Sequence, residues 1–137
     1  MRRKPRALRD LALAALLCAA PAAHAACDAG PGVLRGTTPS MALAFRTTPP
    51  AIKVGELFSL QAELCPQEGV SITGLKVDAS MPAHKHGMNY QPRVAPTGPG
   101  KYTATGLMFH MPGQWQFVFD VETPAGRERI RVDYRAE

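Results

Sequence analysis

Two short segments of this 137-residue chain contain most of its histidine and methionine. Residues 81–92 read Met-Pro-Ala-His-Lys-His-Gly-Met-Asn-Tyr-Gln-Pro, and residues 108–113 read Met-Phe-His-Met-Pro-Gly. Beyond residue 25, these segments hold all three histidines and four of five methionines. Imidazole nitrogen and thioether sulfur are both metal ligands, and thioether favours Cu(I). The clustering therefore predicts a site for a soft metal ion.

In the first segment, the spacing places the two histidines two residues apart. Side chains alternate along an extended backbone, so His84 and His86 are expected to point to the same side. Met88 follows on that side unless Gly87 bends the chain. Met81 opens the segment, and an alternative for this residue is to end a strand and pack in the core.

In the second segment, the same alternation puts Met108 and His110 on one face and Met111 on the other. Pro112 and Gly113 are strand breakers, so Met111 can turn toward the site, and we favour it over Met108. If the two segments meet at one edge of the fold, they bring imidazole and thioether groups together. The predicted ligands are His84, His86, Met88, His110, Met81 and Met111.

Other chemistries fit these residues less well. Met88 stands where the His-x-His-x-Asp pattern of metallo-hydrolases has an acid, which argues against a hydrolytic zinc site. A blue-copper centre needs a cysteine thiolate beside histidine, whereas Cys65 is followed by Pro66 and has no histidine nearby. The chain has no nucleophile elbow and no His-Glu-x-x-His. We therefore expect copper, as Cu(I), and no enzymatic activity.

Alternating apolar and polar residues predict the strands that position these segments. The expected strands are 41–47, 57–64, 72–79, 101–109, 114–121 and 129–134, separated by turn sequences rich in proline and glycine. In three of these strands the alternation predicts an inward face. The expected inward residues are Phe58, Leu60, Ala62 and Leu64 in the second strand, Trp115, Phe117, Phe119 and Val121 in the fifth, and Ile130, Val132 and Tyr134 in the last. The pattern predicts an all-β, immunoglobulin-like β-sandwich of about seven strands over residues 41–137, after an irregular segment, 26–40. An up-and-down barrel is the weaker alternative.

The first 25 residues are typical of a cleavable signal peptide. Five basic residues precede an alanine- and leucine-rich stretch, and Ala23-His24-Ala25 supplies a cleavage pattern. A retained N-terminal anchor is the alternative. Cleavage removes five basic residues and one acidic residue, leaving 11 against 10. No basic stripe remains for nucleic acid. The prediction is a periplasmic protein without a stable membrane anchor.

The cysteine count agrees with export. Cys18 belongs to the signal peptide, so the mature chain keeps Cys27 and Cys65. In an oxidising compartment two cysteines most simply form one disulfide. Two free thiols that serve metal or redox chemistry are the alternative.

Three motifs together resemble the YtkA-like domain family: Met-Pro-x-His-x-His-Gly-Met at 81–88, Gly-x-Tyr at 100–102, and the 106–115 stretch that ends in Pro-Gly-x-Trp. The resemblance spans roughly residues 50–135. It implies an immunoglobulin-like sandwich in the cell envelope and a role in copper handling near cytochrome oxidase assembly. It implicates Met81, His84, His86, Met88 and His110.

Two functions follow from these observations. The first is a periplasmic copper-binding protein that acts as a chaperone, buffer or resistance accessory and passes the metal to a copper-receiving or oxidase-assembly envelope protein. The second is an interaction module without metal, which docks on an envelope complex through the histidine- and methionine-rich loop.

Overall fold

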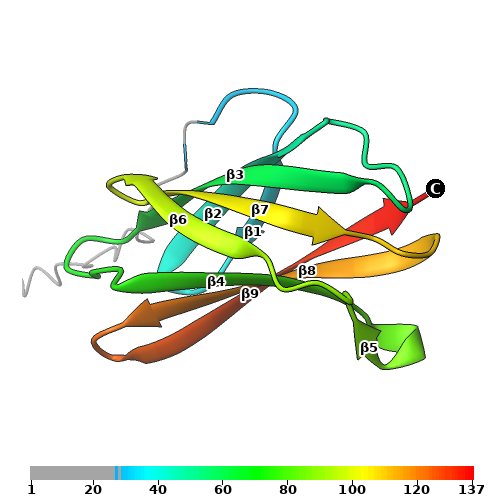
Figure 1. Cartoon of the computed structure of the whole chain (residues 1–137). Coiled ribbons are helices and arrows are strands. Elements are labelled where there is room, and N and C mark those ends of the chain that lie inside the picture. The colour runs from blue at the N-terminus through cyan, green and yellow to red at the C-terminus, as the bar shows by residue number, and fades with distance from the viewer. Residues whose placement is uncertain (1–26, 28) are drawn as a thin grey trace, which may run out of the picture.

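A computed structural model describes Cys27 and residues 29–137. Figure 1 shows two antiparallel sheets packed face to face, which confirms the predicted all-β sandwich. The predicted signal peptide, residues 1–25, lies outside the described residues. Within the described part of the chain, no helix is long and apolar enough to cross a membrane.

The five-stranded sheet has the order β1-β2-β3-β7-β6, and the four-stranded sheet has the order β5-β4-β8-β9. A short 3-10 helix, η1, precedes β5. The elements are β1 (Leu34–Thr37), β2 (Met41–Thr48), β3 (Leu57–Pro66), β4 (Gly74–Met81), η1 (Pro82–His84), β5 (His86–Gly87), β6 (Arg93–Gly98), β7 (Lys101–Met108), β8 (Gly113–Thr123) and β9 (Gly126–Ala136).

The core lies between the sheets and is made by the faces that alternation predicted. All four expected inward residues of β3 and all four of β8 are buried, as are Ile130 and Val132 of β9. Aromatic rings join the two sheets: the centroid of Phe45 on β2 lies 5.0 Å from that of Phe117 and 4.9 Å from that of Phe119. Such pairs add about 0.5–1.5 kcal/mol each beyond their buried area.

Besides shifts of one to three residues at other strand ends, three parts of the chain differ from the sequence-based prediction. Segment 26–40, expected to be irregular, contains β1, a four-residue strand whose glycine and flanking turns hide its alternation. Residues 93–98, which include the start of the expected proline- and glycine-rich turn 96–100, form β6, an edge strand where proline is tolerated. β4 begins and ends two residues later than expected, so that Met81 is its last residue.

β1 also packs against β9 of the other sheet and covers one side of the sandwich. Gly36 makes this approach possible because it has no side chain. A Cβ atom at Gly36 would lie 2.4 Å from Cγ2 of Ile130 and 2.9 Å from Cγ2 of Val132. Both neighbours are branched side chains of the buried core, so neither can move aside without disturbing the packing.

Gly36→Ala is therefore expected to lower the free energy of unfolding by about 1–3 kcal/mol, the usual cost of overpacking. Urea denaturation measures the change. Gly74→Ala is the matched control, because a Cβ there would meet only Glu122 side-chain carbons at 3.6 and 3.7 Å, an ordinary contact. Equal stability of the two variants would show that β1 does not pack on β9 in this way.

The free edge of β4 is covered where β4 ends. β5 pairs with it through Ser80–Gly87 and Met81–His86. One residue earlier, the backbone N–H of Ala79 donates to Oδ1 of Asp78 at 2.7 Å, and the N–H of Met88 donates to the Ala79 carbonyl at 3.1 Å. Both backbone groups of Ala79 therefore have partners on the side away from β8.

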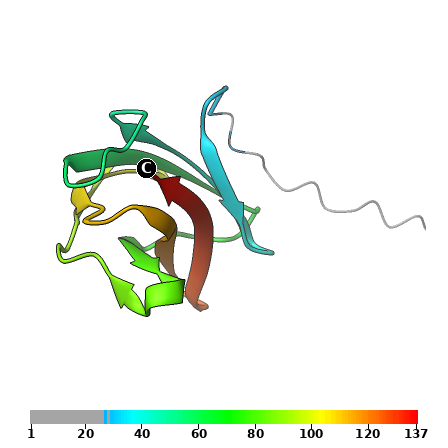
Figure 2. The ribbon, with the colours of Figure 1, turned by 90° about the vertical axis from the view of Figure 1, so that its right-hand side faces the viewer.

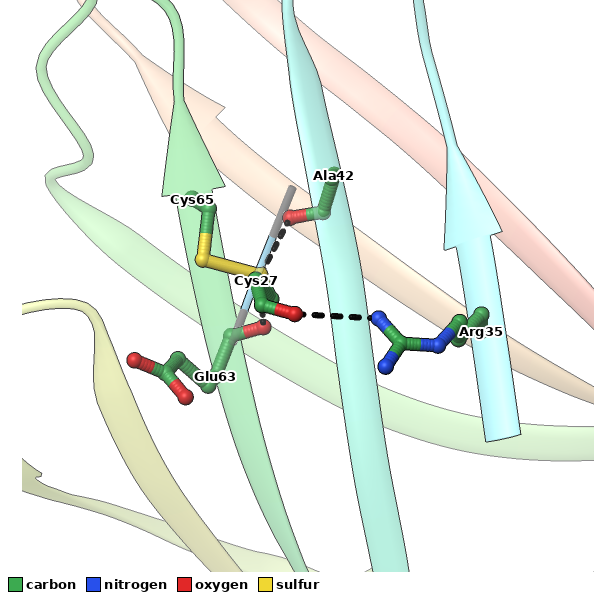
Figure 3. The surroundings of a disulfide bond; sticks show 5 residues. All are labelled: Cys27, Arg35, Ala42, Glu63 and Cys65. Atoms are coloured by element: carbon green, nitrogen blue, oxygen red, sulfur yellow. Dashed lines mark hydrogen bonds between the residues drawn. A yellow bond between two sulfur atoms is a disulfide. The ribbon is translucent and has the colours of Figure 1, made fainter. Parts of the chain in front are cut away.

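A disulfide joins Cys27 and Cys65, with their Cα atoms 5.5 Å apart, which confirms the bridge and excludes the two-free-thiol alternative. It holds the segment before β1 against the outer face of β2 and β3 (Figure 3). Sγ of Cys27 lies 3.5 and 3.3 Å from the carbonyl oxygens of Ala42 and Glu63, as close contacts, since a disulfide sulfur has no hydrogen to donate. Nη1 of Arg35 donates to the Cys27 carbonyl at 3.0 Å.

This bridge explains why β2 is a continuous apolar run, Met-Ala-Leu-Ala-Phe. Met41, Leu43 and Phe45 face the main core, while Ala42 and Ala44 are buried on the other face beneath Cys27. A strand that is covered on both faces has no polar side to alternate with.

Candidate metal site

The first histidine segment is a tight bend rather than an extended strand. Pro82 opens η1, and Lys85 follows it in the left-handed conformation, with φ of 54°. The expectation that extended backbone alone aligns His84 and His86 is therefore wrong, because proline fixes φ near the helical value and the left-handed residue reverses the chain. The bend nevertheless leaves the two imidazole centroids 5.6 Å apart.

The second segment meets the first at the same end of the sandwich. β7 ends at Met108, so His110 lies in the link to β8 and not on the strand. The ring of His110 has its centroid 5.1 Å from that of His86. Figure 2 looks onto this end, where η1, β5 and the β7–β8 link face the viewer. The predicted convergence of two segments distant in sequence is confirmed.

Trp115 is the residue of this site that sequence reasoning assigned only to the core. It is fully buried and stacks on Phe109 with centroids 4.5 Å apart. It also packs edgewise against the rings of His110 and His86, at 5.3 and 6.1 Å. Its Nε1–H donates to the Met111 carbonyl at 2.9 Å, which fixes the β7–β8 link. Its alternating position on β8 predicted its burial but gave no signal of these contacts.

One nitrogen of the site lacks a partner. Nδ1 of His110 is buried and makes no hydrogen bond, and it is the one such side-chain nitrogen or oxygen in the described residues. A buried polar atom without a partner costs about 1–3 kcal/mol. Nδ1 of His86, in contrast, lies 3.2 Å from the Gly87 carbonyl. If that nitrogen carries the proton, Nε2 of His86 is left as a lone-pair donor.

The methionines of the two segments are buried to different depths. Met81 is 1% exposed and packs in the core, against Gly113, so its burial matches the packing alternative; its role as a ligand stays a prediction. Met88 and Met111 are half-buried and also pack against the core. Met88 is held by its backbone bond to Ala79, and Met111 by its carbonyl bond to Trp115.

A family model for YtkA-like proteins matches residues 40–119. The chain belongs to the YtkA-like family. The match begins before the range expected from the motifs and ends earlier, and it includes both histidine segments. In this YtkA-like chain, β1 and β9 lie outside the matched range. No curated protein and no solved structure matches the chain.

In the YtkA-like domain, two arginines of β9 pair with carboxylates of β8. Nε and Nη2 of Arg129 donate to the two carboxylate oxygens of Asp120, at 2.6 and 2.8 Å, which lowers the pKa of Asp120. Nε of Arg127 donates to Glu122 at 2.8 Å. Among the described residues, no group of three or more His, Cys, Asp or Glu side chains is placed to hold a metal ion. An ion bound here would therefore need donors of another kind besides imidazole, and the thioethers of the same two segments are of such a kind.

Proposed function

We propose that this YtkA-like protein is exported to the periplasm and binds Cu(I) there as a chaperone, buffer or resistance accessory. His86, His110 and the thioethers of Met88 and Met111 form the centre of the proposed site, with His84 at its surface. The observation that carries the proposal is the 5.1 Å separation of the ring centroids of His86 and His110, two residues more than twenty positions apart in the sequence.

Three features support a soft, monovalent ion. The carboxylates of β8, Asp120 and Glu122, are paired with arginines, and the proposed ligands include no carboxylate. Cys27 and Cys65 are bonded to each other, so neither supplies a thiolate. Thioether is a ligand type that selects Cu(I), and imidazole binds copper as well. The buried Nδ1 of His110 would gain a partner if it were the coordinating atom.

Export is supported by the basic and apolar composition of residues 1–25 and by the disulfide, which persists in oxidising compartments. A protein that holds Cu(I) without thiolate keeps its ligands in such a compartment. Its partner would be a copper-receiving or oxidase-assembly protein of the envelope, and no step of this function needs a catalytic residue.

The direct test is an anaerobic titration of the mature protein with Cu(I) against a competing chelator. We expect one ion per chain and a Kd below about 1 μM. Met88→Leu should weaken binding roughly 10–100-fold, on the scale of perturbed metal sites. Met41→Leu is the matched control, since Met41 is a core methionine far along the chain from both segments. Binding weaker than micromolar in the wild type would end the proposal.

A second candidate is an interaction module without metal. It is favoured by the two large apolar side chains that are exposed in the described residues, Leu57 at 60% and Tyr90 at 49%. Leu57 pairs with Met108 at the end of β7, and Tyr90 follows β5, so both flank the end that carries the histidines. Binding to an identified envelope partner that survives both a copper chelator and the loss of His110 would favour this candidate.

A further inference from the structure

The three imidazoles of the site differ sharply in how they are held. His110 is half-buried, its Nδ1 is fully buried, and Trp115 packs against its ring. His86 is half-buried and is part of β5, which pairs with β4. His84 is exposed and ends a single turn of 3-10 helix that contains no buried residue.

The three imidazole rings also form a series, with one ring between the other two. His86 lies between the other two, 5.1 Å from His110 and 5.6 Å from His84 by ring centroids. Trp115 restrains the inner two rings, at 5.3 and 6.1 Å. The turn that carries His84 is closed by one long backbone bond, in which the Lys85 N–H donates to the Pro82 carbonyl at 3.3 Å. The three imidazoles therefore range from His110, which is held in the interior, to His84, which is loosely held at the surface.

We propose that these histidines have separate tasks: His86 and His110 retain the copper ion, and His84 is the ligand through which the ion is exchanged with another molecule. This inference rests on the proposed function. An incoming donor cannot approach the buried Nδ1 of His110, but it can approach the exposed His84 from solvent. A donor tethered beside the ion turns each transfer into an intramolecular step, because its effective concentration is high.

The exchange conserves atoms and charge. A nitrogen of His84 forms a bond to Cu(I) as one inner ligand leaves. A neutral donor of the acceptor then binds the ion as the remaining inner ligands leave, and a second donor of the acceptor displaces His84. No electron is transferred, and the ion stays Cu(I) throughout. The acceptor can be any molecule with soft or imidazole donors, so a small-molecule chelator can replace the physiological partner.

The test compares affinity with transfer rate in the full mature protein. His84→Ala should lower Cu(I) affinity by less than about tenfold yet slow transfer to a chelator by about tenfold or more, because the tethered surface donor is lost. Both are measured anaerobically, by equilibrium competition and by stopped-flow absorbance of the chelator complex. Lys85→Ala is the matched control, since Lys85 is the exposed neighbour on the same turn and should leave both quantities unchanged.

The outcomes separate this inference from the proposed function. If His84→Ala weakens binding as much as loss of His110, or transfers copper as fast as the wild type, the division of tasks is wrong although copper binding stands. If the wild type itself does not bind Cu(I), the proposed function fails. Thermal unfolding of the metal-free His84→Ala protein should match the wild type, because the side chain is exposed.

Discussion

Replacing His110 with phenylalanine is expected to weaken Cu(I) binding by more than about 100-fold, because loss of even an outer partner of a metal ligand costs about 10–100-fold. His110 is the proposed imidazole ligand from the β7–β8 link, and its ring centroid lies 5.1 Å from that of His86. Equilibrium competition against a Cu(I) chelator measures the loss. Met108→Leu, two residues earlier and at the end of β7, is the control and should keep the wild-type affinity.

The same substitution, His110→Phe, should not destabilise the metal-free protein, although it weakens copper binding. Phenylalanine has a flat ring like histidine but no buried nitrogen to leave unpaired, and Trp115 offers it an aromatic neighbour. We expect the free energy of unfolding to be unchanged or raised, by up to about 1–3 kcal/mol. Urea denaturation without metal checks this. A less stable variant with unchanged copper affinity would mean that His110 is a structural residue only.

Removing the disulfide is expected to have the largest effect on stability. The bridge closes a loop with a sequence separation of 38. In the chain-entropy account, a loop of this size contributes about 4 kcal/mol by restricting the unfolded chain. The double variant Cys27→Ala, Cys65→Ala should lose about this amount in denaturant unfolding, and it should also free the segment that covers Ala42 and Ala44.

Reductant supplies the internal control. It should lower the stability of the wild type toward that of the double variant and leave the double variant unchanged. Copper affinity should survive, because Cys65 is near the end of β3, whereas the histidines lie at the end where β3 begins. A variant as stable as the wild type would show that the bridge does not restrain the unfolded chain.

The sequence predicted the sandwich because its main strands are covered on one face by the core, and one-sided burial leaves a visible alternation. Phe58 to Leu64 and Trp115 to Val121 are the clearest cases. The elements that were missed lack that alternation for physical reasons. β1 contains the glycine that its contact with β9 requires, and β6 contains a proline that only an edge strand accepts.

The candidate site could be predicted in composition but not in geometry. Residue types and clustering pointed to His86 and His110, and their rings are indeed adjacent. The left-handed Lys85 could not be foreseen from alternation, which assumes an extended chain. Nor could the roles of Trp115 and of the buried Nδ1, because both depend on which link packs beside which strand.

At the end of β4, the free strand edge is covered by η1, β5 and Met88. This cover matters for the solubility of the protein in concentrated solutions. A bare strand edge recruits further strands from neighbouring molecules, which is a route to aggregation. Here the loop that carries the proposed ligands also occupies the Ala79 carbonyl through the N–H of Met88, while Asp78 of β4 accepts from the Ala79 N–H. After deletion of the loop, a loss of metal binding could therefore not be distinguished from aggregation of the protein. Point substitutions within an intact loop avoid this problem.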